Sequence, residues 1–213
     1  MATDPNDPLA PHPERDLVLD TAALRVLAHP MRLNFLHYLR DHGPATGRRL
    51  AEHFALDSGA VSYHLRKLAG GGLIEEDVER GTRRDRWWRV THQALYHDPA
   101  DSPADASDAG AYLQSVLIAY GEALRRYSAD VPHLPQEWFA VTMASERSLR
   151  LTPQQLVELK RDLVSVIDRY RDLPARSAEP DPAALPAQRA AQDLPAAARL
   201  VSVHLHTLPQ VDR

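Results

Sequence analysis

The fold of this chain is decided by the stretch SGAVSYHLRKLAGGGLIEEDVERGTRRDRWWRV, residues 58–90. Val61, Leu65 and Leu68 recur at helical spacing and predict a helix with one apolar side. Three consecutive glycines, residues 70–72, end that helix because glycine is a poor helix former. Residues 73–90 then predict two short strands around a charged tip, with Gly81 placed to take the positive φ of a hairpin turn.

Two helical patterns begin the folded part of the chain. Asp20 or Thr21 can open the first helix, whose apolar positions are Leu24 and Leu27. A second helix starts near Pro30, because proline suits the first helical turn, where its missing N–H has no partner. The apolar residues of this second helix are Leu33, Leu36, Tyr38 and Leu39, and Gly43–Pro44 ends it.

A third helix connects these two to the stretch at 58–90. Thr46 can cap it, and its inward residues are Leu50, Ala51 and Phe54. Asp57 or Ser58 can cap the fourth helix. Helices followed by a hairpin in this order are the plan of a winged helix-turn-helix, which we expect over residues 17–97.

Two segments of this region resemble ArsR-type winged-helix repressors. They are AHPMRLNFLHYL (28–39), with His29-Pro30-Met31-Arg32, and VSYHLRKLAGGGLIE (61–75), with Ser62-Tyr63-His64-Leu65 and Gly72-Leu73-Ile74. The resemblance covers about residues 21–96. It implies a homodimeric repressor that binds double-stranded DNA.

The amino-acid composition excludes several kinds of functional site and shows where the basic charge lies. The chain has 213 residues, 44% of them hydrophobic, and no cysteine, so disulfides, thiolate metal sites and cysteine nucleophiles are excluded. No apolar run is long enough to span a membrane, and residues 1–16 do not look like a signal peptide, so we expect a cytoplasmic protein. The formal charge is −4, but residues 25–92 hold 12 Lys and Arg against 8 Asp and Glu. Basic charge is therefore concentrated in the predicted DNA-binding domain.

The fourth helix is the expected recognition helix, since its apolar side docks and its other side faces base edges. Ser58, Ser62 and Tyr63 should lie deepest in the groove, whereas Arg66 and Lys67 should contact phosphate. His64 either contacts a base or packs within the domain. The full set of candidate DNA-binding residues is Arg48, Ser58, Ser62, Tyr63, His64, Arg66, Lys67, Arg80, Thr82, Arg83 and Arg84.

The predicted wing, residues 79–86, admits two interpretations. Its arginines can reach the DNA backbone or the minor groove, where negative potential favours arginine. Alternatively, they form ion pairs with the acidic residues of the same hairpin. The neighbouring Trp87 and Trp88 could stack on nucleobases, but we favour a structural role in which one covers the core and the other its rim.

The second half of the chain predicts a smaller α+β unit. We expect a disordered tail over residues 1–16, a linker over 98–109 and a C-terminal region over 110–213. That region should contain a helix at 110–128, a strand within 138–151, a helix opened by Thr152 and Pro153, and a strand at 200–207. The overall fold class is therefore α+β, with a mostly helical N-terminal domain and a C-terminal helix and strand unit for dimerisation.

Several roles are open to this C-terminal region. The apolar stripe of the helix at 110–128 is either a dimer surface or core of its own unit, and its dimer candidates are Leu113, Val116, Leu117, Tyr120 and Leu124. An effector pocket for a small molecule could be lined by Trp138, Phe139, Met143 and Tyr170, which would serve equally well as core. His204 and His206 share one face of the predicted strand, yet the helix at 110–128 has no histidine, so we assign no metal and no cofactor.

No enzyme motif is present: the sequence lacks G-x-S-x-G, H-E-x-x-H and a phosphate-binding glycine loop. We therefore expect a regulator and not an enzyme. The alternative is a winged helix that serves protein assembly without specific DNA binding.

Overall fold

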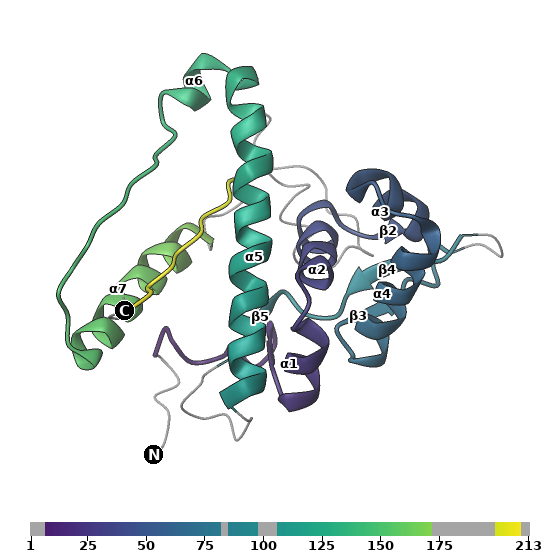
Figure 1. Cartoon of the computed structure of the whole chain (residues 1–213), viewed down its shortest axis with the longest axis horizontal. Helices are drawn as coiled ribbons and strands as arrows, with labels where there is room; N and C mark the ends of the chain where they lie inside the picture. Colours follow the sequence, from purple (N-terminus) through teal and green to yellow (C-terminus); the bar gives the residue numbers. More distant parts are fainter. Residues whose placement is uncertain (1–6, 82–84, 98–105, 172–198, 210–213) are drawn as a thin grey trace.

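The computed structural model describes residues 7–81, 85–97, 106–171 and 199–209 (Figure 1). In chain order its elements are β1 (Asp16–Val18), α1 (Thr21–Leu27), α2 (Pro30–His42), β2 (Ala45–Thr46), α3 (Gly47–Phe54), α4 (Ser58–Gly70), β3 (Ile74–Glu76), β4 (Trp87–Val90), β5 (Ala94–Tyr96), α5 (Ala106–Asp130), the 3₁₀ turn η1 (Val131–His133), α6 (Gln136–Phe139) and α7 (Pro153–Arg171). Helices combined with small sheets confirm the α+β class.

Side-chain caps fix where the N-terminal helices begin. The backbone N–H of Ala23 donates to the Asp20 carboxylate at 2.7 Å, and that of Ala60 donates to the Asp57 carboxylate at 2.9 Å. Thr46 caps α3 by accepting from the Arg49 N–H at 3.3 Å. Each cap satisfies a donor that the helix itself cannot pair. The predicted starts of these helices are confirmed.

The wing is part of a three-stranded antiparallel sheet in the order β2-β4-β3. Glu76 pairs with Trp88 and Glu75 with Arg89, so Glu75 and Glu76 lie on opposite faces of β3. The expectation for Gly81 was wrong, because the glycines with positive φ are Gly43 and Gly72. Gly81 instead donates its N–H to the Asp77 carbonyl at 3.0 Å, in a turn that needs no positive φ.

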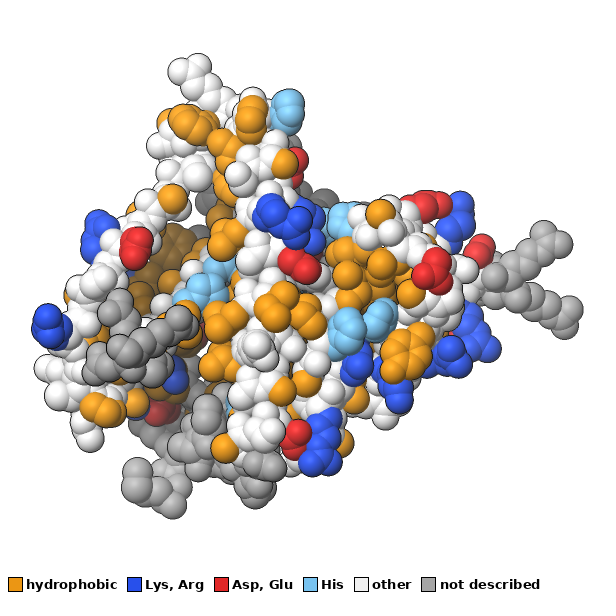
Figure 2. All heavy atoms as spheres, viewed as in Figure 1, with side chains coloured by type: hydrophobic (Ala, Val, Ile, Leu, Met, Phe, Trp, Pro, Cys, Tyr) orange, Lys and Arg blue, Asp and Glu red, His pale blue; other side chains and the backbone are white. Residues whose placement is uncertain are grey.

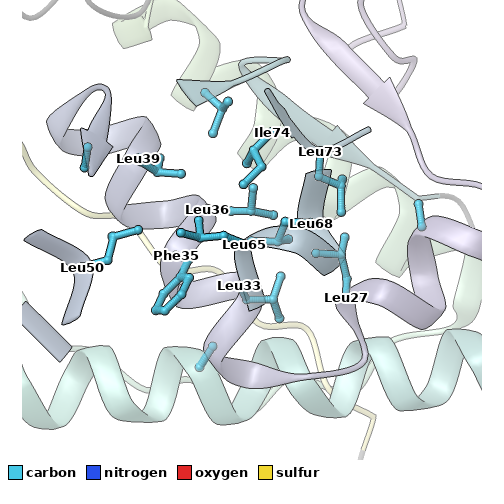
Figure 3. Packing of buried hydrophobic residues seen from close by; sticks show 14 of the residues in the cluster. Leu27, Leu33, Phe35, Leu36, Leu39, Leu50, Leu65, Leu68, Leu73 and Ile74 are labelled. Atoms are coloured by element: carbon cyan, nitrogen blue, oxygen red, sulfur yellow. The ribbon is translucent and has the colours of Figure 1, made fainter. Parts of the chain in front are cut away.

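One hydrophobic core joins α1, α2, α4 and the sheet (Figure 3). Phe35, Leu50 and Leu68 are completely buried in it. The helix α5 belongs to the same unit, since its Ser115 and Ala119 are buried against α1 and α2. The predicted linker at 98–109 was therefore too long: α5 begins at Ala106, and Asp108 binds Arg25 of α1 at 2.9 Å.

The two strands predicted in the C-terminal region do not form. Residues 136–139 are the short helix α6, while residues 143–152 and 199–209 have no regular secondary structure. Both segments alternate in hydrophobicity, but neither has a hydrogen-bonded neighbour among the described residues, and a strand needs one. Both helix predictions are confirmed: α5 spans the predicted 110–128. The helix α7 begins at Pro153, and Thr152 and Gln155 exchange hydrogen bonds of 2.9 and 3.2 Å.

The N-terminal segment is more structured than its composition predicts. Residues 16–18 form β1, which pairs in parallel with β5. Asp7 accepts two hydrogen bonds of 3.1 Å from the Arg161 guanidinium of α7. Disorder is therefore wrong for residues 7–16. In the part of the chain that is described, no helix is both long and apolar enough to cross a membrane.

Candidate nucleic-acid interface

The helix α4 presents one polar, solvent-facing side next to the hairpin (Figure 2). Val61, Leu65 and Leu68 are buried, as predicted, and this orientation leaves Ser58, Ser62, Tyr63, Arg66 and Lys67 exposed. The ammonium group of Lys67 lies 5.8 Å from the centre of the Tyr63 ring, and Tyr63 itself is 47% exposed. Short polar groups and basic groups therefore share one open face.

An open groove of about 600 Å³ lies between this face, the start of α3 and the hairpin. Its lining residues are Thr46, Gly47, Arg48, Ser62, Leu65, Arg66, Glu76, Asp85, Arg86 and Trp88. Three of these residues are arginines and two are acidic, so the groove carries an excess of positive charge. Thr46, Gly47 and Arg48 at the start of α3 line the same groove, and helix N-termini favour anions. The groove therefore has the charge and donors to hold a phosphate backbone.

Two arginines of the groove form ion pairs that are exposed and long, while Arg66 donates its Nε–H to the Ser62 carbonyl at 3.1 Å. Arg86 lies 3.8 Å from Glu76, and Arg48 lies 3.6 Å from Glu52. Their side chains are 72% and 76% exposed, and ion pairs of this kind contribute little to stability. Both arginines can exchange their carboxylate for a phosphate at small cost.

The wing itself shows internal pairing where it is described. Arg80 lies 3.4 Å from the nearly buried Asp77 carboxylate, and Arg89 lies 2.8 Å from Glu75. This arrangement favours the internal ion-pair interpretation for Arg80. Thr82, Arg83 and Arg84 lie outside the described residues.

The His64 side chain packs within the domain and does not extend into the solvent-facing side of α4. Its ring lies 4.7 Å from that of His29 and 5.8 Å from that of Phe35, and its Nδ1 is buried without a hydrogen-bond partner in the described residues. Burial, followed by the charges of His29 and Arg32, lowers the pKa of His64 and favours the neutral ring. The packing alternative is thus the better supported one.

The sequence analysis did not find Arg86, Thr46 or Gly47 as groove residues. Arg86 directly precedes β4 and Trp88 is two residues further on, so alternation along the extended chain would have placed them on one face. Trp88 also packs against the hydrophobic core, in agreement with a structural role for one of the two tryptophans.

The candidate dimer residues divide between two environments. Leu113 and Leu124 are 50% and 52% exposed, whereas Val116 packs against the core of the N-terminal domain. Leu117 is half-buried, and Tyr120 stacks on His37 at 5.6 Å and lies 4.6 Å from the His204 ring. Part of the stripe is therefore core, and part is free to meet a partner.

Three of the four residues considered for an effector pocket face solvent, and the fourth, Trp138, is half-buried. Phe139, Met143 and Tyr170 are 57%, 84% and 70% exposed, and Trp138 lies under the Arg199 guanidinium at 5.6 Å. Such exposure fits an interface better than the wall of a pocket. Among the residues that can be described, no group of three or more histidine or acidic side chains could hold a metal ion.

Comparison with known proteins identifies the domain that carries the groove. Residues 27–77 match the family model of a helix-turn-helix domain. A crystal structure of a possible transcriptional regulator for arsenical resistance is 27% identical; the match covers 53% of this chain and 96% of that one, with a TM-score of 0.29. A ZitR mutant from Lactococcus lactis is 14% identical, over 66% and 73% of the two chains, with a TM-score of 0.28. No curated protein matches. The chain contains a helix-turn-helix domain, the DNA-binding unit of many transcription regulators.

Proposed function

We propose that this protein is a dimeric, sequence-specific DNA-binding transcription regulator of the ArsR type that represses by occupying its operator. One observation carries the proposal: the polar face of α4 opens onto a groove flanked by Arg48, Arg66 and Arg86. A recognition helix needs short polar groups for base edges and basic groups for phosphates, and this face supplies both.

Each part of the groove has a distinct task in this proposal. Ser58, Ser62 and Tyr63 read base edges from the first turns of α4, which enter deepest into the major groove. Arg66, Lys67 and Arg86 bind phosphates on either side. The N–H groups that begin α3 hold one further phosphate.

The wing tip completes the contact with DNA in this proposal. Thr82, Arg83 and Arg84 reach the flanking backbone or the minor groove. Arg80 contributes less to DNA binding because it is paired with the Asp77 carboxylate.

A second copy of the chain belongs to the proposal for two reasons. A single domain reads few base pairs, whereas two-fold repetition places two recognition helices on successive major grooves about 34 Å apart. In addition, all but three of the exposed large apolar side chains in the described residues lie between Leu113 and Leu208. An apolar surface this extensive is unusual on a monomer and typical of an interface. We propose that Leu113, Leu117 and Leu124 of α5 contribute to it.

Selection of bound sequences from a random duplex pool tests the proposal. We expect a two-fold symmetric site, whose affinity for the full chain falls steeply as salt rises because bound phosphates release counterions. Arg66→Ala should weaken binding to the selected site, while Arg147→Ala, an exposed arginine outside the groove, should leave it unchanged.

Failure to enrich any sequence with folded protein would contradict the proposal. It would favour the alternative in which the winged helix serves protein assembly.

A further inference from the structure

Two histidine rings join the start of α2 to the proposed recognition helix α4. The centres of the His29 and His64 rings lie 4.7 Å apart in an edge-on arrangement. The His64 ring also meets the Phe35 ring of α2 edge-on, at 5.8 Å. The His29–His64 pair is therefore part of the contact by which α2 supports α4.

His29 has a structural role that requires a neutral ring. Its Nδ1 atom accepts the backbone N–H of Met31 at 3.2 Å, which makes His29 the N-cap of α2. An imidazolium carries a hydrogen on both ring nitrogens and has no acceptor left. A positive charge is also unfavourable at the N-terminus of a helix, because the helix dipole repels cations there. Protonation of His29 therefore removes the cap of α2.

The buried nitrogen of His64 imposes the same requirement on the recognition helix. Its Nδ1 atom is inaccessible to solvent and has no hydrogen-bond partner among the described residues. In a neutral ring this atom can be an unpaired acceptor, whereas in an imidazolium it is a charged donor without an acceptor. A buried charged donor without a partner is the more costly of the two. Protonation of His64 therefore weakens the packing of α4 on α2.

The charged groups that surround the pair are cationic. Burial lowers the pKa of both rings, and repulsion from Arg32 of α2 lowers both further. On α4, the Tyr63 ring lies 5.4 Å from that of His64, and the Lys67 ammonium lies 5.8 Å from the Tyr63 ring. Within the described residues no carboxylate forms an ion pair with either histidine. These surroundings supply no anion that would stabilise an imidazolium.

We propose that the His29–His64 pair is a pH-sensitive contact that holds α4 in its DNA-binding position only while both rings are neutral. Acidification removes the cap of α2 and places positive charge between α2 and α4, so the two helices separate at this contact. The response of α4 to pH is a property of the free protein. Its effect on the affinity for DNA rests on the proposed function.

The direction of the effect distinguishes this contact from ordinary electrostatics. The chain has 11 histidines, and charging them makes the protein more positive, which by itself strengthens binding to a polyanion. A His64 side chain that contacted DNA directly would also bind more tightly when protonated. Here the separated state has the ordinary histidine pKa and the packed state a lower one, so the packed state is lost as the pH falls below about 6.5. Affinity for DNA should therefore decrease on acidification.

Fluorescence anisotropy with the selected duplex at pH 7.5 and 5.5, at constant ionic strength, tests the effect on DNA binding. We expect the wild-type affinity to fall about tenfold, as one histidine with a pKa of about 6.5 in the separated state allows. His29→Asn keeps an oxygen that can cap α2 but does not titrate, and it should reduce the fall to about threefold. Combination with His64→Gln should abolish the fall. His133→Gln, at an exposed position, should retain the wild-type fall.

Nuclear magnetic resonance of the full-length protein without DNA tests the contact separately. The ring signals of His29 and His64, assigned by their absence in the two variants, should titrate below the ordinary histidine range. The backbone amide signals of α4 should shift along the same curve, while those of α7 report that the rest of the chain stays folded.

Three results would overturn the proposal. They are a wild-type affinity that stays constant or rises on acidification, an equal fall in wild type and in the double variant, and α4 amide signals that do not follow the histidine titration. The last result needs no duplex, so it is distinct from a failure of the proposed function. His64→Gln alone serves as the second non-titrating variant if His29→Asn folds poorly.

Discussion

Asn34 and Glu122, 88 positions apart, form a side-chain hydrogen bond of 2.7 Å that ties α2 to α5. Asn34 is 2% exposed, so its amide has no access to water when the bond is absent. Glu122 is the only acidic residue between positions 110 and 128, and its hydrogen bond to the buried Asn34 amide gives it a structural role. The bond makes α5 part of the DNA-binding domain and not an appendage to it.

Glu122→Ala should lower the free energy of unfolding by about 1–3 kcal/mol, because the buried Asn34 amide then lacks its acceptor. Urea denaturation of the variant and of wild type measures the difference. The control is Glu137→Ala on α6, where the carboxylate is exposed and a change within about 0.5 kcal/mol is expected. Equal stabilities of the two variants would show that the bond is unimportant.

Ser62→Ala combined with Tyr63→Ala should relax base discrimination, because these residues occupy the part of α4 assigned to base edges. The ratio of affinities for the selected duplex and for single-base variants measures this. Arg66→Ala is the matched comparison: it should weaken binding to all sequences alike and reduce the slope of log affinity against log salt by up to about one. Reversed effects of the two variants would contradict the assignment.

Glu76→Gln should raise DNA affinity at low salt by a few-fold, since it frees Arg86 from its 3.8 Å ion pair and removes a negative charge from the groove. Fluorescence anisotropy with a labelled duplex measures the change. Glu75→Gln alters the neighbouring residue on the opposite face of β3 and should have a smaller effect. A larger effect for Glu75 would mean that DNA approaches the other face.

Acidification should destabilise the protein through His37. Burial, with added repulsion from Arg40 and His204, lowers the pKa of His37 from 6.5 to about 4. The unfolded chain therefore binds a proton before the folded one does, and stability falls as the pH drops from 6.5 towards 4. Between pH 7.5 and 5 the loss from this residue is about 2 kcal/mol.

Denaturation at the two pH values, compared between wild type and His37→Gln, measures this contribution. The variant should lose less stability on acidification than wild type does. His133→Gln, at an exposed position, should behave like wild type. An identical pH dependence in wild type and His37→Gln would contradict the prediction.

Thr152→Ala should destabilise the start of α7 by about 1 kcal/mol, because Thr152 accepts the Gln155 N–H. Hydrogen exchange of the first-turn amides of α7 measures this local effect as an increase of roughly fivefold in rate. Gln154→Ala is the control within the same turn. Equally fast exchange in the two variants would show that the Thr152 cap does not stabilise the start of α7.

The N-terminal half was largely predictable because its signals are local. Asp20, Thr46 and Asp57 cap the helices that their positions suggest, and Pro30 begins α2. The apolar spacing of α4 also determined which of its faces is open, and so most of the candidate recognition residues. Local capping and periodicity need no knowledge of distant partners.

Features that depend on distant pairing were not predictable. Residues 200–207 alternate like a strand, yet alternation describes a side-chain pattern and supplies no neighbouring strand. The parallel pairing of β1 with β5 joins residues nearly 80 positions apart, so no local pattern predicts it. Arg86 was missed because alternation with Trp88 gives only its face of the hairpin, whereas its place in the groove depends on α4 lying beside that face.

Hydroxyl-radical footprinting of the full chain on its selected duplex tests the central claim most directly. Two protected patches related by two-fold symmetry and centred about 34 Å apart along the duplex are the result expected of a dimer with one α4 in each major groove. A single protected patch, or none at protein concentrations that shift the duplex, would contradict dimeric recognition through α4.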